Sequence, residues 1–318
     1  MSGGPTPFLV VGEALVDLVG AAGSRELVAH PGGSPANVAL ALARLTEPVT
    51  LVTRLGRDAF GEMVAAHLEA SGVRVDRGLD DGFRTSLAVA TLAEGNAGYD
   101  FRIDWDLGPL ADPPPGTRCL HTGSLATALA PGSASVADLV AREHRRGRVT
   151  VSYDPNVRPR LLGTPAAARG GIEQLVAASD VVKVSDEDLG WLYDGRGHEE
   201  VAREWLARGP ALVVVTRGAA GVFAVARGAT VALPAVPIDL VDTVGAGDSF
   251  TAGLLFGLDR AELLGGSRRA ALAGISEETL TGVLAATAGR VSALTCARPG
   301  ADPPTLAELD PSSAGASR

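Results

Sequence analysis

Short apolar runs that end in polar or glycine-rich residues, and that alternate with helical stretches, constrain the fold of this chain most. Four of them read RCLHTGSL, RVTVSYDPN, DVVKVSDED and ALVVVTRG. Nearer the beginning, a run over Phe8–Gly12 precedes a helical pattern that starts at Ser34-Pro35, and a run over Val49–Gly56 precedes a helical pattern that Gly72 closes. Strands that alternate with helices predict a parallel sheet covered by helices. We therefore expect an α/β fold with a central, mostly parallel sheet flanked by helices on both faces.

Two hairpins interrupt this alternation. The segment Thr85–Asp106 contains two strand-like runs around the turn residues EGNAG, and GVFAVARGATVALPA has the same form. Hairpins inserted into an α/β chain are often lids or edge additions. We expect residues of about 13–30 and 85–106 to form a small β-sheet lid.

Two further helices are predicted near the end of the chain, from Asp248 to about Gly257 and from about Glu277 to Leu294. No internal repeat or long linker divides the sequence. Its length and its content of 46% hydrophobic and 20% charged residues are typical of a globular chain. We expect one domain over residues 1–318.

Composition also excludes several classes of protein. The net charge of −9 argues against a nucleic-acid partner. No apolar run reaches the roughly 18 residues of a membrane span, and MSGGPTPF lacks the pattern of a secretion signal. The two cysteines, Cys119 and Cys296, form neither a metal-spaced pair nor a disulfide framework. We expect a cytoplasmic protein without nucleic-acid or membrane partners.

Two common nucleotide-binding motifs are absent from the sequence. No G-x-x-x-x-G-K-[ST] loop occurs, which excludes a P-loop nucleotidase. Phe250 occupies the last glycine position of a G-x-G-x-x-G pattern, so the dinucleotide-binding signature is absent as well. The chain contains one lysine, Lys183, and any mechanism that needs a lysine must use it.

The stretch LVDTVGAGDSF places Gly245, Ala246 and Gly247 directly before Asp248 and an apolar helix. Glycines allow close approach to a ligand, and a helix start offers free N–H groups and a positive dipole end. Together they predict an anion site for a phosphate in transit, with Asp248 placed to take a proton from an attacking hydroxyl. The alternative is a turn followed by an Asp that only caps the helix.

Other polar residues also follow predicted strands, where ligands gather in open parallel sheets. Gly33 belongs to a Gly-Gly turn, and Asn37 in the following helix could bind a sugar hydroxyl or serve only the helix start. Asp17, which closes the first strand region, could accept hydrogen bonds from two hydroxyls or be an exposed loop acid.

A third group lies in KVSDEDL. Asp186, Glu187 and Asp188 could act on a magnesium ion through water, or form a solvated acidic helix start. Lys183 could reach a phosphate or extend out of its strand toward solvent.

With these residues in place, the chain resembles the ribokinase-like (PfkB) family of carbohydrate kinases from about Phe8 to Asp310. The matching signatures are GGSPANVALALARL at Gly32–Leu45 and DTVGAGDSFTAGLL at Asp242–Leu255. The stretches HTGSL, YDPNVRPRLL, KVSDEDL and TRGAAGV also match. The GGSPANVA and DPNVR forms resemble the fructokinase and 2-keto-3-deoxygluconate kinase branch most.

The resemblance implies a ribokinase-like sheet, a small β lid over the sugar, and transfer of the ATP γ-phosphoryl group to a sugar hydroxyl. It implies Asp248 as catalytic base, with the N–H groups of Gly245, Ala246 and Gly247 as an anion hole. It also implies roles for three further groups: Asp17, Gly33 and Asn37 for the sugar; Lys183, Ser185, Thr216, Gly218 and Gly221 for ATP; and Asp188 for Mg²⁺ through water. The family's N-x-x-E motif reads S-D-E-D here. Asp242 and the loop near Gly300 match a monovalent-cation site, taken by K⁺ in some members.

We therefore expect an ATP-dependent sugar kinase that acts on fructose. 2-Keto-3-deoxygluconate or a nucleoside is the alternative substrate, and a sugar-binding relative without catalysis is the alternative class. Arg102 and Arg158 could pair with the carboxylate of a sugar acid or have structural roles. A homodimer through the lid is a further expectation, because Leu87, Val89 and Phe101 supply apolar lid residues.

Overall fold

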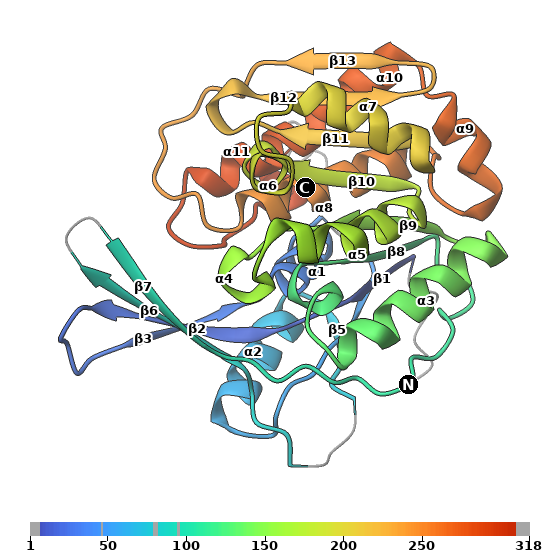
Figure 1. Cartoon of the computed structure of the whole chain (residues 1–318). Helices are drawn as coiled ribbons and strands as arrows, with labels where there is room; N and C mark the ends of the chain where they lie inside the picture. The colour runs from blue at the N-terminus through green and yellow to red at the C-terminus, as the bar shows by residue number, and fades with distance from the viewer. Residues whose placement is uncertain (1–6, 46, 79–81, 94–95, 310–318) are drawn as a thin grey trace, which may run out of the picture.

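The computed structural model describes residues 7–45, 47–78, 82–93 and 96–309, and among them nine strands form a main sheet (Figure 1). The strand order is β13-β12-β11-β10-β9-β8-β1-β4-β5. The strands from β11 to β5 in this order pair in parallel, and β12 and β13 add antiparallel at one edge. The strands are β1 (Phe8–Val11), β4 (Val49–Val52), β5 (Arg74–Asp76), β8 (Cys119–Gly123), β9 (Thr150–Asp154), β10 (Val181–Ser185), β11 (Leu212–Thr216), β12 (Val222–Ala226) and β13 (Thr230–Leu233).

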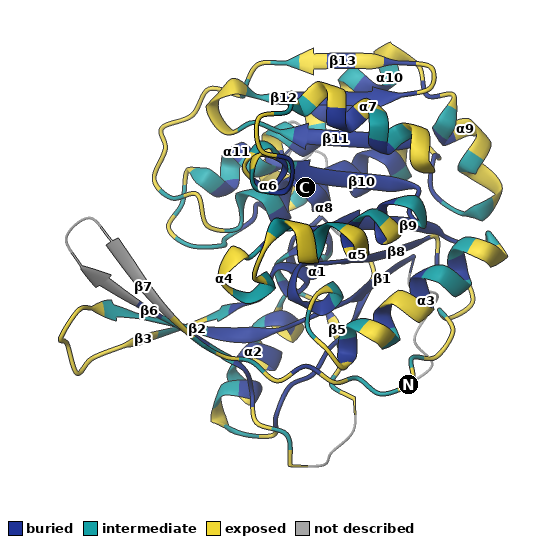
Figure 2. Cartoon of the chain, in the orientation of Figure 1, coloured by how far each residue is buried: buried dark blue, intermediate teal, exposed yellow. Residues whose placement is uncertain are grey.

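The central strands are buried on both faces, which explains their continuous apolar sequences. Successive residues point to opposite sides of a strand, so Phe8 and Val10 enter one hydrophobic core while Leu9 and Val11 enter another. Figure 2 shows these strands as an almost unbroken buried layer.

Helices cover both faces of this sheet, as predicted. The core on one face includes residues of α1 (Ser34–Arg44), α2 (Ala59–Ala70), α8 (Ala246–Arg260), α9 (Arg269–Ala273), α10 (Glu277–Gly282), α11 (Arg290–Cys296) and α12 (Leu306–Leu309). The core on the other face includes residues of α3 (Gly132–Arg146), α5 (Pro165–Ala177), α6 (Asp186–Leu192) and α7 (His198–Arg208). The short α4 (Pro159–Leu162) and the 3₁₀ helix η1 (Ser124–Thr127) follow β9 and β8.

The predicted helix over Glu277–Leu294 contains a π-helical segment, η4 (Val283–Gly289), between α10 and α11. This segment packs against Gly253 and Gly257 of α8. A Cβ on Gly253 would lie 2.9 Å from Ala288 Cα, so the two backbones meet where a side chain is missing. Local propensity does not reveal this tertiary contact.

The predicted strand over Val49–Gly56 is too long, because β4 ends at Val52. One more hydrogen bond, from the Thr53 N–H to the Asp76 carbonyl of β5, follows the end of β4. The chain then leaves the main sheet, and the Gly56 N–H donates to the Thr85 side chain at 3.1 Å.

A separate four-stranded sheet projects from the body of the molecule (Figure 1). Its order is β3-β2-β6-β7, and β6 and β7 form the predicted hairpin. The strands β2 and β3 lie almost wholly within the residues of about 13–30 that were predicted to form the lid with 85–106. The strands are β2 (Leu15–Ala21), β3 (Val28–Gly32), β6 (Leu87–Ala93) and β7 (Asn96–Arg102). Glu94 and Gly95, in the predicted turn EGNAG, lie outside the described residues.

Within the described residues, none of the helices is both long enough and apolar enough to cross a bilayer.

Candidate active site

Polar side chains gather where the parallel strands of the main sheet end. Asp154 ends β9, Ser185 ends β10 and Thr216 ends β11. Because neighbouring parallel strands carry their carboxyl ends to one edge, these residues lie along the same edge of the sheet.

Asp248 lies in the first turn of α8 and is 8% exposed. Its Oδ1 accepts a hydrogen bond from Ser34 Oγ at 2.6 Å, and its Oδ2 accepts one from Asn37 Nδ2 at 2.8 Å. Both donors belong to α1, which packs against α8. The carboxylate is therefore held in one orientation by a helix more than 200 residues away in sequence. Gly245 is the N-cap of α8, so the alternative in which Asp248 only caps the helix is wrong.

Burial raises the pKa of Asp248 above its usual value, although the hydrogen bonds from Ser34 and Asn37 and the charge of Lys183 lower it. Asp154 adds a raising contribution. A carboxylate with a raised pKa accepts a proton more readily than an exposed one, which suits a general base.

The start of α8 contains the residues predicted for an anion site. Gly245 has φ 74°, in the left-handed region that favours glycine, and α8 begins at Ala246, two residues earlier than predicted. The Ala246 N–H donates to the Thr243 carbonyl at 3.2 Å. Gly247 follows in the first turn, where N–H groups point out of the helix toward a ligand.

Lys183 lies beside the N-terminus of α8. It is 5% exposed, so the alternative in which it extends to solvent is wrong. Its Nζ donates to Asp154 Oδ2 at 2.9 Å and would lie 3.0 Å from a Cβ on Gly247. Burial alone would lower the pKa of Lys183, but Asp154, Asp188 and Asp248 raise it above its usual value. The amine therefore stays charged beside the N-terminus of α8.

Asp188 and Ser185 form a capping box at the start of α6. The Asp188 carboxylate also accepts the Val157 N–H at 3.0 Å. Burial raises its pKa, and Asp154 raises it further. Asp188 is 9% exposed, so the alternative of a solvated helix start does not apply to it, although its neighbour Glu187 is exposed.

The predicted nucleotide loop lies next to Ser185. Thr216 pairs with Ser185 across β10 and β11, and its Oγ1 is 3.4 Å from the Val184 carbonyl. Gly218 and Gly221 have φ 49° and 86°. A Cβ on Gly221 would lie 2.0 Å from the Leu233 carbonyl oxygen, so this position requires glycine.

Asp242 lies in the loop before α8. Its carboxylate accepts the Gly300 N–H at 2.8 Å and the Val244 N–H at 3.1 Å, which lowers its pKa. The loop near Gly300, matched with Asp242 by the sequence, is thus beside it in space. Among the described residues, no group of three or more His, Cys, Asp or Glu side chains is arranged to hold a metal ion directly.

The residues predicted for the sugar come from the second sheet and from the starts of α1 and α4. Asp17 lies inside β2 and does not close the first strand, and its carboxylate packs against Gly32, where a Cβ would lie 2.1 Å from Oδ2. Burial raises the pKa of Asp17; His30 and Arg158 lower it, and the charge of Asp248 raises it further. Asp17 and Asp248 therefore lie near enough for their charges to interact.

The other residues predicted for the sugar differ in their positions and hydrogen-bond partners. Gly33 is the N-cap of α1 with φ 104°. Arg158 precedes α4, and its Nη1 donates to Asn156 Oδ1 at 2.6 Å. Arg102 ends β7 and is exposed. Asn37 was predicted for a sugar hydroxyl or for the helix start, but its Nδ2 is bound to Asp248.

Ser34 and Asp154 also belong to this cluster. Ser34 was not predicted as a site residue, because it looks in sequence like a helix start before a proline. Asp154 ends a strand in the DPN stretch and is among the polar strand-end residues from which a shared cleft was expected, although it was given no role.

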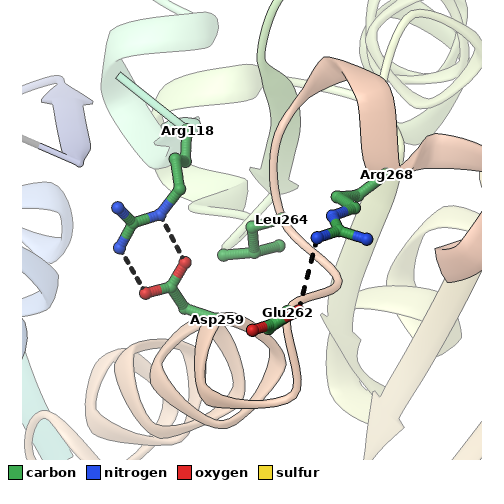
Figure 3. A pocket seen from close by; sticks show the side chains of 5 residues that line it. All are labelled: Arg118, Asp259, Glu262, Leu264 and Arg268. Carbon is green, nitrogen blue, oxygen red and sulfur yellow. Dashed lines mark hydrogen bonds and ion pairs between the residues drawn. The ribbon is translucent and has the colours of Figure 1, made fainter. Parts of the chain in front are cut away.

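A cavity of about 270 Å³ lies elsewhere (Figure 3). Its lining residues are Arg118, Asp259, Glu262, Leu264 and Arg268. Asp259 is eleven residues beyond Asp248 on α8, or about 16 Å along the axis. The Arg118 guanidinium makes two hydrogen bonds to the Asp259 carboxylate, at 2.7 and 2.5 Å. This cavity is separate from the cluster around Asp248.

The sheet order and the residues around Asp248 define a ribokinase-like α/β kinase. A solved structure of fructokinase with bound ATP from Xylella fastidiosa is similar with a TM-score of 0.81 and 27% identity, over 96% of this chain and 97% of that one. A double mutant of fructokinase from Vibrio cholerae O395, in fructose, ADP and potassium ion bound form, is similar with a TM-score of 0.77 and 27% identity, over 96% and 98%.

The family model described as pfkB family carbohydrate kinase matches residues 6–301, and the chain belongs to this family. A fructokinase from Rhizobium leguminosarum bv. trifolii is 35% identical over 266 residues, which are 81% of this chain and 81% of that protein. The chain is thus a sugar kinase, a phosphotransferase with an alcohol as acceptor.

Proposed function

We propose that this protein is an ATP-dependent fructokinase. The observation that carries the proposal is the Asp248 carboxylate, buried at the glycine-rich start of α8 and oriented by Ser34 and Asn37. The fructokinases among its relatives support fructose as the acceptor.

In the proposed mechanism, Asp248 takes the proton of the sugar hydroxyl that attacks the γ-phosphoryl group. The start of α8, with Gly245, Ala246 and Gly247, would face the migrating group with its positive dipole end and its N–H groups, and the Ala246 N–H would have to leave the Thr243 carbonyl to which it donates here. Lys183 adds a fixed positive charge beside Gly247. Rate acceleration then arises mostly from positioning and electrostatic stabilisation.

ATP is proposed to lie over Ser185, Thr216, Gly218 and Gly221, at the carboxyl ends of β10 and β11. Mg²⁺ suits this donor set only through water and phosphate oxygens, because the Asp188 carboxylate already accepts backbone N–H groups. When bound, Mg²⁺ neutralises charge on the phosphates.

The sugar is proposed to bind between Asp248 and the second sheet, near Asp17, Gly33, Asn37 and Arg158. The second sheet would act as a lid that excludes water, within a single domain over residues 1–318. Arg102, exposed at the end of β7, is proposed to contact the outer part of the sugar.

K⁺ is proposed to bind near Asp242 and the Gly300 loop. The Asp242 carboxylate is fixed there by two backbone N–H groups, and the solved structure from Vibrio cholerae O395 is a potassium-bound form. Comparing turnover in KCl with turnover in tetramethylammonium chloride tests this site.

We also propose a homodimer through the lid. Leu87, Val89 and Phe101 are partly buried, and Leu27 and Val28, at the start of β3, are exposed to 42% and 60%. Light scattering of the wild type and of Val28→Glu tests it, since a lid dimer would dissociate in the variant.

A coupled ADP-release assay with fructose, 2-keto-3-deoxygluconate, ribose and adenosine tests the function. We expect fructose to give the highest kcat/KM. Preference for the sugar acid, lost in Arg158→Gln, would instead support the sugar-acid alternative. Sugar binding without ADP release from any acceptor would support the non-catalytic alternative.

A further inference from the structure

The backbone of one residue, Ala126, connects two places where the chain passes between the main sheet and the second sheet. Glu13 lies between β1 of the main sheet and β2 of the second sheet, and its Oε2 accepts the Ala126 N–H at 3.0 Å. Trp105 follows β7 of the second sheet, and its Nε1 donates to the Ala126 carbonyl at 3.0 Å. The peptide groups on the two sides of Ala126 thus bind the segment that leads from β1 into β2 and the segment that follows β7.

These contacts are shielded from solvent. Ala126 is fully buried, and Glu13 and Trp105 are each 3% exposed. Polar groups buried in this way cost free energy unless their hydrogen bonds are made. Breaking either contact therefore leaves an unsatisfied group at the junction of the sheets.

The 3₁₀ helix that carries Ala126 also supports the base of the second sheet. Leu125 forms a small hydrophobic cluster with Leu15 of β2 and Ala88 of β6. This cluster is separate from the two cores on the faces of the main sheet. The base of the second sheet thus rests on η1, while the backbone of η1 is bound by Glu13 and Trp105.

Close packing leaves little freedom at the junction. A Cβ on Gly33 would lie 2.5 Å from the Glu13 carbonyl oxygen, and a Cβ on Gly132 would lie 2.5 Å from the Trp105 ring. Gly33 is the N-cap of α1, which carries Ser34 and Asn37. Glu13 therefore lies two residues before the strand that bears Asp17, and its carbonyl packs against the turn that leads to the Asp248 donors.

We propose that Glu13 and Trp105 are positioning residues that hold the second sheet to Ala126 and so set the place of Asp17 relative to Asp248. This inference rests on the proposed function, in which the sugar binds between these two carboxylates. It predicts that both residues act on sugar binding and leave ATP binding unchanged, because ATP would lie over β10 and β11.

The chemistry of Glu13 suits this role. Burial raises the pKa of its carboxyl to about 7, although the Ser124 hydroxyl, backbone N–H groups and the nearby Arg158 charge lower it. Either protonation state keeps an oxygen that can accept the Ala126 N–H. A glutamine at this position keeps that acceptor as well.

The experiment compares Glu13→Ala, Glu13→Gln and Trp105→Phe with the wild type. Trp105→Phe keeps an aromatic ring but loses the Nε1 donor. We expect KM for fructose to rise about tenfold in Glu13→Ala and about fivefold in Trp105→Phe, in the range for a lost buried hydrogen bond. Glu13→Gln should stay within about twofold of the wild type, and KM for ATP should not change in any of the three.

A second measurement does not depend on activity. Hydrogen exchange of the β2 amides, Leu15–Ala21, should become faster in Glu13→Ala and Trp105→Phe, while exchange in β11 stays at the wild-type rate. If Glu13→Ala does not fold, Trp105→Phe and Glu13→Gln still test the proposal.

Unchanged fructose KM in the alanine and phenylalanine variants, or an equal rise in both substrates' KM, would overturn the inference. A glutamine variant as impaired as the alanine variant would overturn it too. A wild-type protein that does not phosphorylate fructose would instead contradict the proposed function, and the exchange rates of β2 would then still test the anchoring.

Discussion

The two sheets of this molecule differ in what surrounds them. Strand β11 of the main sheet is buried from Leu212 to Val215, whereas β3 of the second sheet exposes Val28 to 60%. Figure 2 shows the same contrast between the buried central strands and the exposed edge of the projecting sheet. Among the described residues, helices pack on both faces of the main sheet, whereas the second sheet carries exposed residues such as Val28.

This difference places different requirements on the residues that each sheet carries. Lys183, on a buried strand, has its charge compensated by Asp154 within the protein. Asp17, on the second sheet, is only partly buried, and hydrogen-bonding groups of a ligand can reach it. The sheet with two covered faces therefore suits fixed charges, and the open sheet suits an exchangeable substrate.

Asp248→Asn should give the largest effect, because it removes the proposed catalytic base. We expect turnover to fall by about a hundredfold or more with folding retained, measured by ADP release and circular dichroism. Asp138→Asn, at an exposed position on α3, is the matched control and should keep wild-type turnover. Near-normal turnover in Asp248→Asn would exclude it as the base.

Lys183→Met should strongly destabilise the main sheet, because Asp154 would remain as a buried, unpaired charge. We expect the free energy of unfolding to fall by about 3–5 kcal/mol, measured by urea denaturation. Adding Asp154→Asn to this variant should recover much of the loss. If the single variant unfolds at the wild-type urea concentration, the ion pair does not contribute as its burial implies.

Truncation of one apolar side chain in each sheet compares their packing directly. Leu51→Ala, at a fully buried position of β4, should cost about 2–5 kcal/mol. Val28→Ala, at an exposed position of β3, should stay within about 0.5 kcal/mol of the wild type. Equal losses in thermal or chemical denaturation would mean that Val28 is covered in solution, as a lid dimer would require.

The smallest expected effect is a pH dependence of stability that arises from Glu13, at the junction between the two sheets. The pKa of Glu13 in the folded protein is about 7, above the 4.5 of an ordinary glutamate. The folded state therefore binds a proton more tightly than the unfolded state, and this stabilisation is lost as pH rises from about 4.5 to 7. Because Glu13→Gln lacks this loss, its Tm relative to the wild type should rise between pH 5 and pH 8, on the order of 5 °C. Parallel Tm profiles of the two proteins would contradict this assignment.

The main sheet could be predicted from the sequence because continuous apolar strands such as LVVVT are typical of parallel sheets. The lid over about 13–30 and 85–106 was predicted, but the bounds of β2 and β3 within it were not, because LVDLVGA and VAHPG give only short, mixed patterns. The pairing of β2 with β6 joins residues about 70 positions apart, which no local pattern encodes.

The candidate site could be named in part from the sequence. The glycine-rich helix start and the motif resemblance both pointed to Asp248 and the glycines before it, and their roles stay predictions. The hydrogen bond from Ser34 could not be predicted, because it depends on how α1 packs against α8. Nor does the sequence indicate that Ala126 holds two chain crossings, since both contacts involve its backbone.

The single lysine has a practical consequence for following this protein in solution. Amine-selective reagents find only one side-chain target in the sequence, and that amine lies in the candidate active site. Its covalent labelling, read by mass spectrometry, would therefore record how often the site opens to solvent. Slower labelling in the presence of a nucleotide or a sugar would report occupancy directly, without an engineered probe.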